Sequence, residues 1–188
     1  MTGQHSKQHG LTLIELMVTV AVLGILAAWG YPAFTGLVSQ MQYNRTRDAL
    51  VDTLSAARND AIFNSRTVRV CASLNGSSCD PTPTDWDTGW IVHEDCNGDA
   101  IRDTTNVCDR DRDGTVDTAN AAERIIRTYG PPDHPVTATA GAVTFFPTGQ
   151  DAPGTTCTIT TAQGNGTVEV NAAATIFSKG IQAAPATP

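Results

Sequence analysis

Apolar positions dominate the first part of the chain. Between Leu11 and Ala28 only Thr12, Glu15 and Thr19 are polar. A stretch of about 18 residues is long enough to cross a bilayer core as a helix that rises about 1.5 Å per residue. The pattern therefore predicts a membrane-spanning helix that carries one carboxylate, Glu15, near its start.

Beyond this stretch the apolar positions take the spacing of an amphipathic helix. Pro32 predicts a kink or a brief break at the junction, because proline has no backbone N–H to donate. After it, apolar side chains recur at steps of three and four, and polar side chains take the other side. We expect this helix to reach about Ser65 and to cover a globular core with one face. The apolar residues of that face are Phe34, Leu37, Val38, Met41, Leu50, Leu54, Ala57, Ala61 and Ile62.

Alternating patterns replace the helical spacing after residue 66 and predict short strands. Turn-forming residues separate the runs, and the polar, acidic segment 96–123 is predicted to be a long loop. The last two long runs form a predicted hairpin around AQGNG, and ATIFSKG ends the fold. One long helix followed by strands predicts an α+β fold, in which the helix packs on an antiparallel β-sheet. The predicted strands are 67–73, 90–92, 124–130, 142–150, 155–161 and 167–172.

Composition and charge narrow the class of protein. The chain has 188 residues, of which 40% are apolar and 16% charged, so it is a folded chain with one compact domain beyond the first segment. The formal net charge is −7. A nucleic-acid binder usually carries a basic face, so this balance argues against one, although a local basic patch remains compatible with it.

The cysteines indicate an oxidising compartment. There are five of them and no C-x-x-C pair, which disfavours a zinc site and favours disulfides. The pairings that we expect are Cys71–Cys79 and Cys96–Cys108, which leave Cys157 unpaired. Sequence alone does not fix this connectivity.

Glu15 separates two interpretations of the first segment. A secretory signal peptide fits the short flank MTGQHSKQHG and the small residues in LAAWG. However, an ionisable group inside an apolar stretch costs about 2–3 kcal/mol even on lenient insertion scales, and such a group normally has a partner and a function. A cleaved signal peptide is also not expected to continue into a second helical segment.

The segment GLTLIELMV resembles the prepilin leader motif of type IV pilins and type II secretion pseudopilins. Gly10, Glu15 and Pro32 stand where that family has them, whereas Leu11 stands where the family prefers Phe. The resemblance implies that a prepilin peptidase cuts after Gly10 and that Leu11 is then N-methylated. It also implies that Glu15 lies beside the amino terminus of a neighbouring subunit in a filament. A free α-amine titrates at about 8 and is the cationic partner that a buried carboxylate needs.

The rest of the chain resembles the GspH/FimT family of minor pilins and pseudopilins. The similar segments are DWDTGWIVHEDCNGD, ERIIR and VTFFPTG, and His93 replaces the usual aromatic residue in the first of them. The resemblance implies a single-pass inner-membrane protein with its globular domain in the periplasm, which joins other pilins through its first helix. The family pattern W-x-x-G-W-x-V-F-x-D-x-N is matched at Trp86, Gly89, Trp90, Asp95 and Asn97.

The predicted organisation follows from these resemblances and patterns. It comprises a leader peptide (1–10), a transmembrane and filament-core helix (11–31), the amphipathic half of that helix (32–66), a β-rich globular pilin domain (67–180) and a loose tail (181–188).

The acidic segment DRDRDGTVDTANAAE looks like a calcium loop. Alternating aspartates present hard oxygen ligands to one centre, and Gly114 permits the sharp turn. Asn120 takes the place of the closing glutamate, and no helices are predicted to flank the loop. A solvated acidic insertion near a disulfide is the alternative, and no other cofactor is expected. The candidate ligands are Asp109, Asp111, Asp113 and Asp117.

DNA is a second candidate ligand. Some members of the family are linked to DNA uptake through basic residues after a glycine in the carboxy-terminal loop. Here Ile181 follows Gly180 and Lys179 is the only base nearby, which argues against that role. Arginines near the end of the helix could contact phosphates, although a solvated helix face with ion pairs is the favoured alternative. These arginines are Arg45, Arg47, Arg58, Arg66 and Arg69.

Three functions therefore compete. The favoured one is a filament subunit, of either a type IV pilus or a type II secretion system, whose two branches share leader and fold. The second is a tip pilin that captures DNA or a surface ligand. The long acidic insertion and the extra cysteines indicate an elaborated surface, which fits a position at the filament tip slightly better. An anchored enzyme is not expected, because the chain has no nucleophile elbow or phosphate loop.

Overall fold

The computed structural model describes residues 12–80, 85–99, 101–105, 107–117, 122–149, 151–152, 154–161, 164–171, 173 and 175–182. Side chains at 29–33 and 151–152 lie outside this description, as do the leader peptide and Leu11. The chain divides into two compact units, residues 1–40 and 41–188.

The predicted long helix is confirmed as α1 (Leu13–Phe63). It begins after Thr12, whose Oγ1 accepts a hydrogen bond from the Glu15 N–H at 3.3 Å, as an N-cap residue does. The helix continues through position 32, so the brief break that Pro32 allowed does not occur. It is followed by Ser65 in a left-handed conformation, with φ at 47°.

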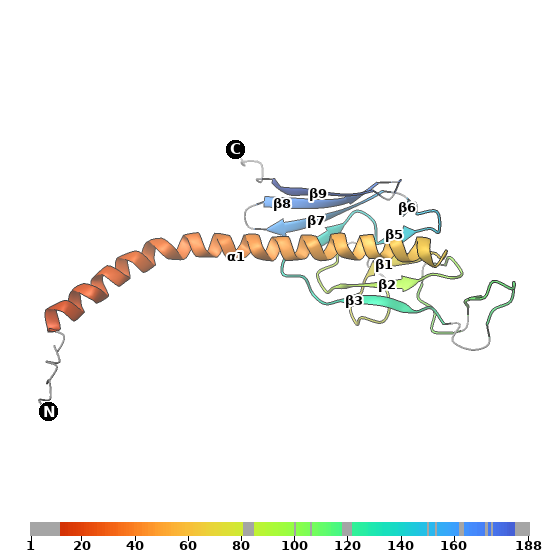
Figure 1. Ribbon diagram of the computed structural model, residues 1–188, viewed down its shortest axis with the longest axis horizontal. Helices are drawn as coiled ribbons and strands as arrows, with labels where there is room; N and C mark the ends of the chain where they lie inside the picture. Colours follow the sequence, from red (N-terminus) through yellow and green to blue (C-terminus); the bar gives the residue numbers. More distant parts are fainter. Residues whose placement is uncertain are drawn as a thin grey trace, which may run out of the picture. The chain divides into compact units, whose positions relative to one another are not determined.

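The strands form two antiparallel sheets within residues 41–188 (Figure 1). One has the order β3-β2-β1-β5-β6 and the other β4-β7-β8-β9. The sequence predicts one sheet, and the division arises because β7 pairs with β4 and β8, and β8 pairs with β9. The bounds are β1 (Val68–Ala72), β2 (Trp90–Glu94), β3 (Ile125–Tyr129), β4 (Val136–Ala138), β5 (Ala142–Phe145), β6 (Asp151–Ala152), β7 (Thr155–Thr161), β8 (Gly164–Val170) and β9 (Ile176–Gln182).

Most of these strands coincide with predicted ones. The strands β4, β6 and β9 are not among the predicted ones: runs of three and two residues show no periodicity, and the segment of β9 was predicted only to end the fold. The strand β8 begins at Gly164, three residues before the predicted start, and β9 continues to Gln182, two residues into the predicted tail. The predicted hairpin is confirmed by the pairing of β7 with β8.

The core lies between α1 and the two sheets. From Met41 onward, α1 lies alongside both sheets (Figure 1), and Leu50, Leu54 and Ala57 are fully buried against them. Only part of the predicted apolar face is used in this way, because Phe34, Leu37, Met41 and Ile62 stay exposed. The strand residues of the core are Val68, Val70, Ala72, Trp90, Val92, Val136, Ala138, Val143, Phe145, Cys157, Ile159, Val168 and Val170.

The two tryptophans of the sequence motif are core residues. The indole N–H of Trp90 donates to Thr53 Oγ1 on α1 at 3.0 Å, and its ring stacks on Tyr129 with centroids 5.6 Å apart. The ring centroids of Trp86 and Trp90 are 6.0 Å apart. Gly89 between them has φ at +105°, and a Cβ there would overlap the Tyr129 carbonyl oxygen, so this position requires glycine.

Candidate functional site

The first part of α1 presents an apolar surface. Every large apolar side chain from Leu13 to Leu26 is about half exposed or more, with Leu13 reaching 77%. A contiguous patch of this kind on a protein surface marks an interaction site. Within the described residues, no helix combines the length and the hydropathy that a membrane span requires. The residues of the patch are Leu13, Ile14, Leu16, Met17, Val18, Val20, Val22, Leu23, Ile25 and Leu26.

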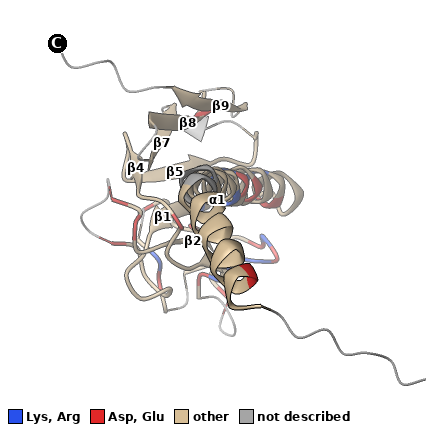
Figure 2. Ribbon diagram, turned by 90° about the vertical axis from the view of Figure 1, so that its left-hand side faces the viewer, with Lys and Arg blue, Asp and Glu red and all other residues tan. Residues whose placement is uncertain are grey.

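Glu15 is the acidic residue of the first turn of this helix. Figure 2 shows acidic colour (red) near the start of α1, on a stretch that is otherwise tan. The Glu15 side chain is exposed, and its carboxylate has no ion pair or hydrogen bond within the described part of the chain. The carboxylate is therefore available to a group on another molecule. Gly10 and Leu11, the predicted cleavage and methylation positions, lie outside the described residues, as does the Pro32 side chain.

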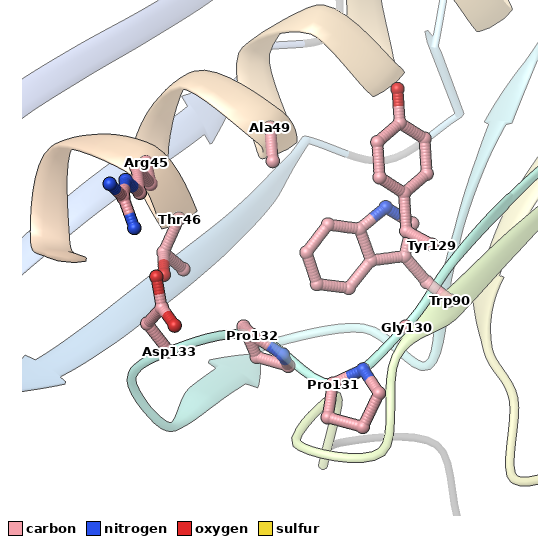
Figure 3. Close-up of a pocket in the computed structure, with 9 residues that line it drawn as sticks. All are labelled: Arg45, Thr46, Ala49, Trp90, Tyr129, Gly130, Pro131, Pro132 and Asp133. Carbon is pink, nitrogen blue, oxygen red and sulfur yellow. The ribbon is translucent and has the colours of Figure 1, made fainter.

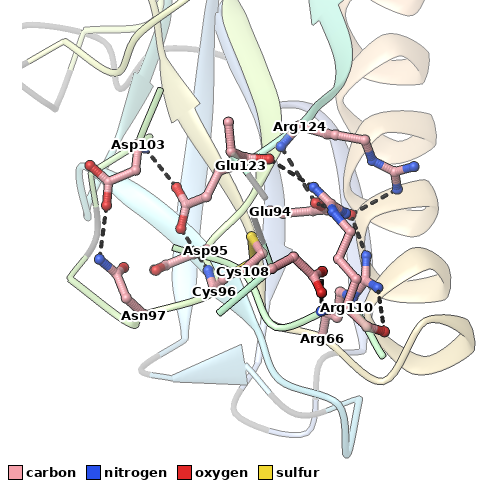
Figure 4. Close-up of a disulfide and its surroundings, with 12 residues drawn as sticks. Arg66, Glu94, Asp95, Cys96, Asn97, Asp103, Cys108, Arg110, Glu123 and Arg124 are labelled. Atoms are coloured by element: carbon pink, nitrogen blue, oxygen red, sulfur yellow. Dashed lines mark hydrogen bonds and ion pairs between the residues drawn. A yellow bond between two sulfur atoms is a disulfide. The ribbon is translucent and has the colours of Figure 1, made fainter. Parts of the chain in front are cut away.

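A buried carboxylate on β2 organises the other end of the globular unit. Glu94 is fully buried and forms ion pairs with Arg66 at 3.0 Å, Arg110 at 2.8 Å and Arg124 at 2.7 Å (Figure 4). Burial alone would raise the pKa of Glu94. The hydrogen bond and charge of Arg110, with the charge of Arg124 and the hydrogen bond from Arg66, outweigh it and lower the pKa. The cluster thus joins the end of α1, the long loop and β3.

A second buried carboxylate closes the long loop. The Glu123 oxygens accept the backbone N–H groups of Cys96 at 2.6 Å and Asp103 at 2.9 Å (Figure 4). Burial raises the pKa of Glu123 in spite of these two bonds, and the charges of Asp95 and Asp103 add to the rise. Glu123 therefore ties the end of the long loop to two points of the segment that the Cys96–Cys108 disulfide closes.

His93 lies between these groups. It is fully buried on β2, with Nδ1 at 2.6 Å from the Glu94 carbonyl oxygen and 3.7 Å from Glu123 Oε2. Its Nε2 is 3.3 Å from Cys79 Sγ. Burial lowers the pKa of His93, outweighing the Glu94 carbonyl and the charge of Asp95. A buried imidazole thus occupies the position where the family has an aromatic residue.

Both predicted disulfides are present. The Cα atoms of Cys71 and Cys79 are 5.6 Å apart, and those of Cys96 and Cys108 are 5.2 Å apart. Cys157 is a free thiol in the core, and burial raises its pKa to about 12. Two groups of potential metal ligands contain these disulfide sulfurs, which are not thiolates and so do not offer a metal site.

The predicted calcium loop is partly assembled. Carboxylate oxygens of Asp109, Asp111 and Asp117 lie within 4.8 Å of one another. The Asp113 carboxylate instead accepts the N–H of Thr115 at 2.8 Å and its hydroxyl at 2.6 Å. Asn120 lies outside the described residues. Calcium binding stays a prediction, which a calorimetric titration with millimolar calcium tests.

Most of the predicted DNA-binding residues have partners within the globular unit, and DNA binding by them stays a prediction. Arg47 pairs with Asp48 at 2.7 Å, Lys179 with Glu169 at 3.0 Å, and Arg66 with Glu94. Arg58 donates to the Gly149 carbonyl at 3.1 Å, and Arg69 lies 3.9 Å from Asp95. Arg45 lines a groove beside Trp90 and the turn at 130–133 (Figure 3). These side chains serve mainly in ion pairs and contacts within the globular unit.

Sequence reasoning missed the cluster around Glu94. Its arginines are 28, 16 and 30 residues away, and no local motif links them. The signal that was available is the carboxylate that follows the apolar run WIV in the segment WIVHE, since a carboxylate needs a partner when it is buried.

Comparison with known proteins decides the family. The family model described as "Type II transport protein GspH" matches residues 46–174. The chain belongs to the GspH family. A second model, "Prokaryotic N-terminal methylation motif", matches residues 5–31 and so covers the segment that resembles a prepilin leader. The predicted relation to GspH/FimT-type pilins is confirmed.

Curated relatives of this GspH-family chain include fimbrial proteins. A type IV major fimbrial protein FimA of Dichelobacter nodosus is 32% identical over 90 residues, which are 48% of each chain. Fimbrial protein Q of Moraxella bovis is 36% identical over 75 residues, 40% of this chain and 47% of that protein. The chain thus spans about half the length of the curated relatives that it matches.

Among solved structures, the type IV minor pilin FimU of Pseudomonas aeruginosa is similar to this chain. The TM-score is 0.48 at 14% sequence identity, over 73% of this chain and 92% of FimU.

Proposed function

We propose that this GspH-family protein is a minor pilin or pseudopilin that joins or primes a type IV pilus or a type II secretion filament through α1. The observation that carries the proposal is the exposed apolar surface of residues 13–26, a helical stretch in which Glu15 is the one acidic residue. In a filament, neighbouring helices would cover this surface. The role is structural rather than catalytic.

Glu15 would set the position of each subunit. Prepilin peptidase would cut after Gly10 and leave Leu11 as the new amino terminus, to be N-methylated. An α-amine with a pKa of about 8 is cationic at neutral pH, so it can pair with a carboxylate that assembly buries. A subunit would then dock only where Glu15 meets the amine of a neighbour, since an unpaired buried charge is costly.

Before assembly, residues 11–31 would hold the protein in the inner membrane, with the globular unit in the periplasm. This location rests on the sequence of that segment, part of which lies outside the described residues. The two disulfides support it, since such bonds persist in an oxidising compartment such as the periplasm.

Mass spectrometry of the chain recovered from sheared filaments tests the proposal. We expect a mature chain that begins at Leu11 and carries one methyl group on its amine. A chain that begins after LAAWG would instead support a signal peptide, and an unprocessed chain in the filaments would refute processing after Gly10. A Gly10→Val variant is the matched control, because it should stay uncleaved and should be missing from the sheared fraction.

Deletion of the gene separates the two branches. Loss of surface pili or twitching with normal secretion would make the protein a type IV minor pilin. Retention of exoproteins in the periplasm with normal pili would make it a type II pseudopilin. A DNA-binding tip subunit has less support, because Arg47, Arg66 and Lys179 are already paired within the globular unit.

A further inference from the structure

A pocket opens beside the buried Glu94, between the long loop and the start of β3. Its charged lining residues are Arg102, Arg110, Arg124 and Glu123, so guanidinium groups outnumber carboxylates there. Figure 4 shows Arg110 and Arg124 on either side of Glu94, with Glu123 beside them. This local balance contrasts with the net charge of −7 for the whole chain.

Two of these guanidinium groups have donors to spare. Arg102 donates from Nη1 to the Ser77 carbonyl at 3.2 Å, while its Nε is shielded from solvent and has no hydrogen-bond partner within the described chain. The Arg124 side chain is 58% exposed and uses only Nη2, in its bond to Glu94, among the described residues. A guanidinium carries five N–H donors, so both side chains keep further N–H groups that have no partner among the described residues.

The nearby carboxylates do not accept hydrogen bonds from these unused N–H donors. Both oxygens of Glu123 already accept backbone N–H groups, from Cys96 and Asp103. Glu94 is shared by Arg66, Arg110 and Arg124, so one negative charge faces three positive ones. The Asp103 carboxylate accepts the Asn97 side-chain amide, and the Asp95 carboxylate accepts the Gly98 N–H.

The pocket is also held in shape. Arg110 donates to Glu94 at 2.8 Å and to the Ala122 carbonyl at 2.7 Å, which fixes its side chain across the loop. The Cys96–Cys108 disulfide closes the segment that carries Arg102. A preformed set of donors binds an anion without first having to order its own side chains.

We propose that this pocket binds a tetrahedral oxyanion, a phosphate or sulfate group, between Arg102 and Arg124. The planar fork of a guanidinium matches such an anion with two parallel hydrogen bonds. A small anion fits better than an extended polyanion, because the loop at 109–117 that contains Arg110 also carries four aspartates, which would repel a long chain of phosphates.

Isothermal titration calorimetry on the full chain in a non-ionic detergent tests this. Sodium phosphate is titrated into the protein, and sodium chloride of the same ionic strength is titrated in a parallel control. We expect saturable phosphate binding in the millimolar range or tighter, which Arg102→Gln and Arg124→Gln each weaken about tenfold through the loss of a charged hydrogen bond. Arg47→Gln removes a surface cation outside the pocket and should leave the affinity unchanged. Near-UV circular dichroism confirms that each variant is folded.

One further variant and one further ligand complete the experiment. Arg102→Lys keeps the charge but loses the fork, and should bind more weakly than the wild type. Glycerol phosphate distinguishes the source of the anion: equal affinity indicates a phosphate carried on a larger molecule, and binding of the free ion alone indicates an inorganic anion. The proposal is overturned if no saturable binding occurs, or if Arg47→Gln weakens binding as much as Arg124→Gln does.

Discussion

The hydroxyl of Tyr43 donates a hydrogen bond to the main-chain carbonyl of Lys179 at 2.9 Å, and so joins α1 to β9 across 136 residues of sequence. The ring of Tyr43 is buried and lies directly against Gly166 on β8. This contact fixes the helix on the second sheet. It requires that residue 166 have no side chain.

Gly166→Ala should destabilise the fold. Its Cβ would overlap the Tyr43 ring, and overpacking of this kind costs about 1–3 kcal/mol of unfolding free energy. Gly180→Ala is the matched control, because the space around Gly180 is open, and its effect should stay within about 0.5 kcal/mol. Urea unfolding of both variants measures this, and equal effects would contradict the contact.

Glu94→Gln should also be strongly destabilising. It removes the charge that compensates Arg66, Arg110 and Arg124, and breaking a buried ion pair costs about 3–5 kcal/mol. Asp52→Asn breaks the exposed pair with Arg127, where the loss should be much smaller because solvent screens the two charges. If chemical denaturation gives Glu94→Gln a loss as small as that of Asp52→Asn, the cluster does not hold the loop.

Stability should depend on pH through His93. Burial lowers the pKa of His93 in the folded chain, so between that value and about 6.5 the unfolded chain binds more protons. The contribution of neutral His93 to the unfolding free energy is complete above about pH 6.5 and is lost as the pH falls towards the pKa of His93 in the folded chain. The lowered pKa of Glu94 adds a loss below about pH 4.5, whereas the raised pKa of Glu123 acts in the opposite direction.

His93→Gln isolates this effect from the neighbouring Glu94, Asp95, Glu123, Arg69 and Arg102. The variant has no titrating ring, so its stability relative to the wild type should improve as the pH falls from 7.5 to 5.5. Unfolding free energies at several pH values measure the difference. A difference that stays constant across this range would show that His93 does not titrate with unfolding.

Cys157 should be chemically inert in the folded protein. Its thiol is fully buried, and a pKa of about 12 leaves almost no thiolate at neutral pH. A thiol reagent should label one cysteine after unfolding under non-reducing conditions and none before it. Labelling of the native chain would contradict the buried position.

The sequence predicted what short-range patterns determine. The spacing of apolar residues was enough for α1, and the Cys71–Cys79 and Cys96–Cys108 pairs close short loops that are visible in the sequence. The division into two sheets was not predictable, because it depends on which distant strands pair. The same holds for Glu94 and Arg66, which meet only after the sheet has formed.

Of the candidate functional residues, some were also recognisable from the sequence and others were not. Glu15 was recognisable because a carboxylate in an apolar stretch is costly on its own. The arginine pocket was not, since Arg102 and Arg124 lie in what the sequence presents as a polar loop and the edge of a short strand. Tertiary packing also decides which end of the apolar helix face enters the core. Leu50 is buried there, whereas Phe34 stays exposed.

The most direct test of filament assembly is the amount of a Glu15→Ala variant in sheared filaments relative to its amount in the membrane fraction. Glu169→Ala is the control, because it removes an exposed carboxylate of β8 that pairs with Lys179. The account predicts normal membrane levels for both variants and at least a tenfold loss of Glu15→Ala from the filaments, about 1.4 kcal/mol or more. Incorporation of Glu15→Ala at the level of Glu169→Ala would contradict it.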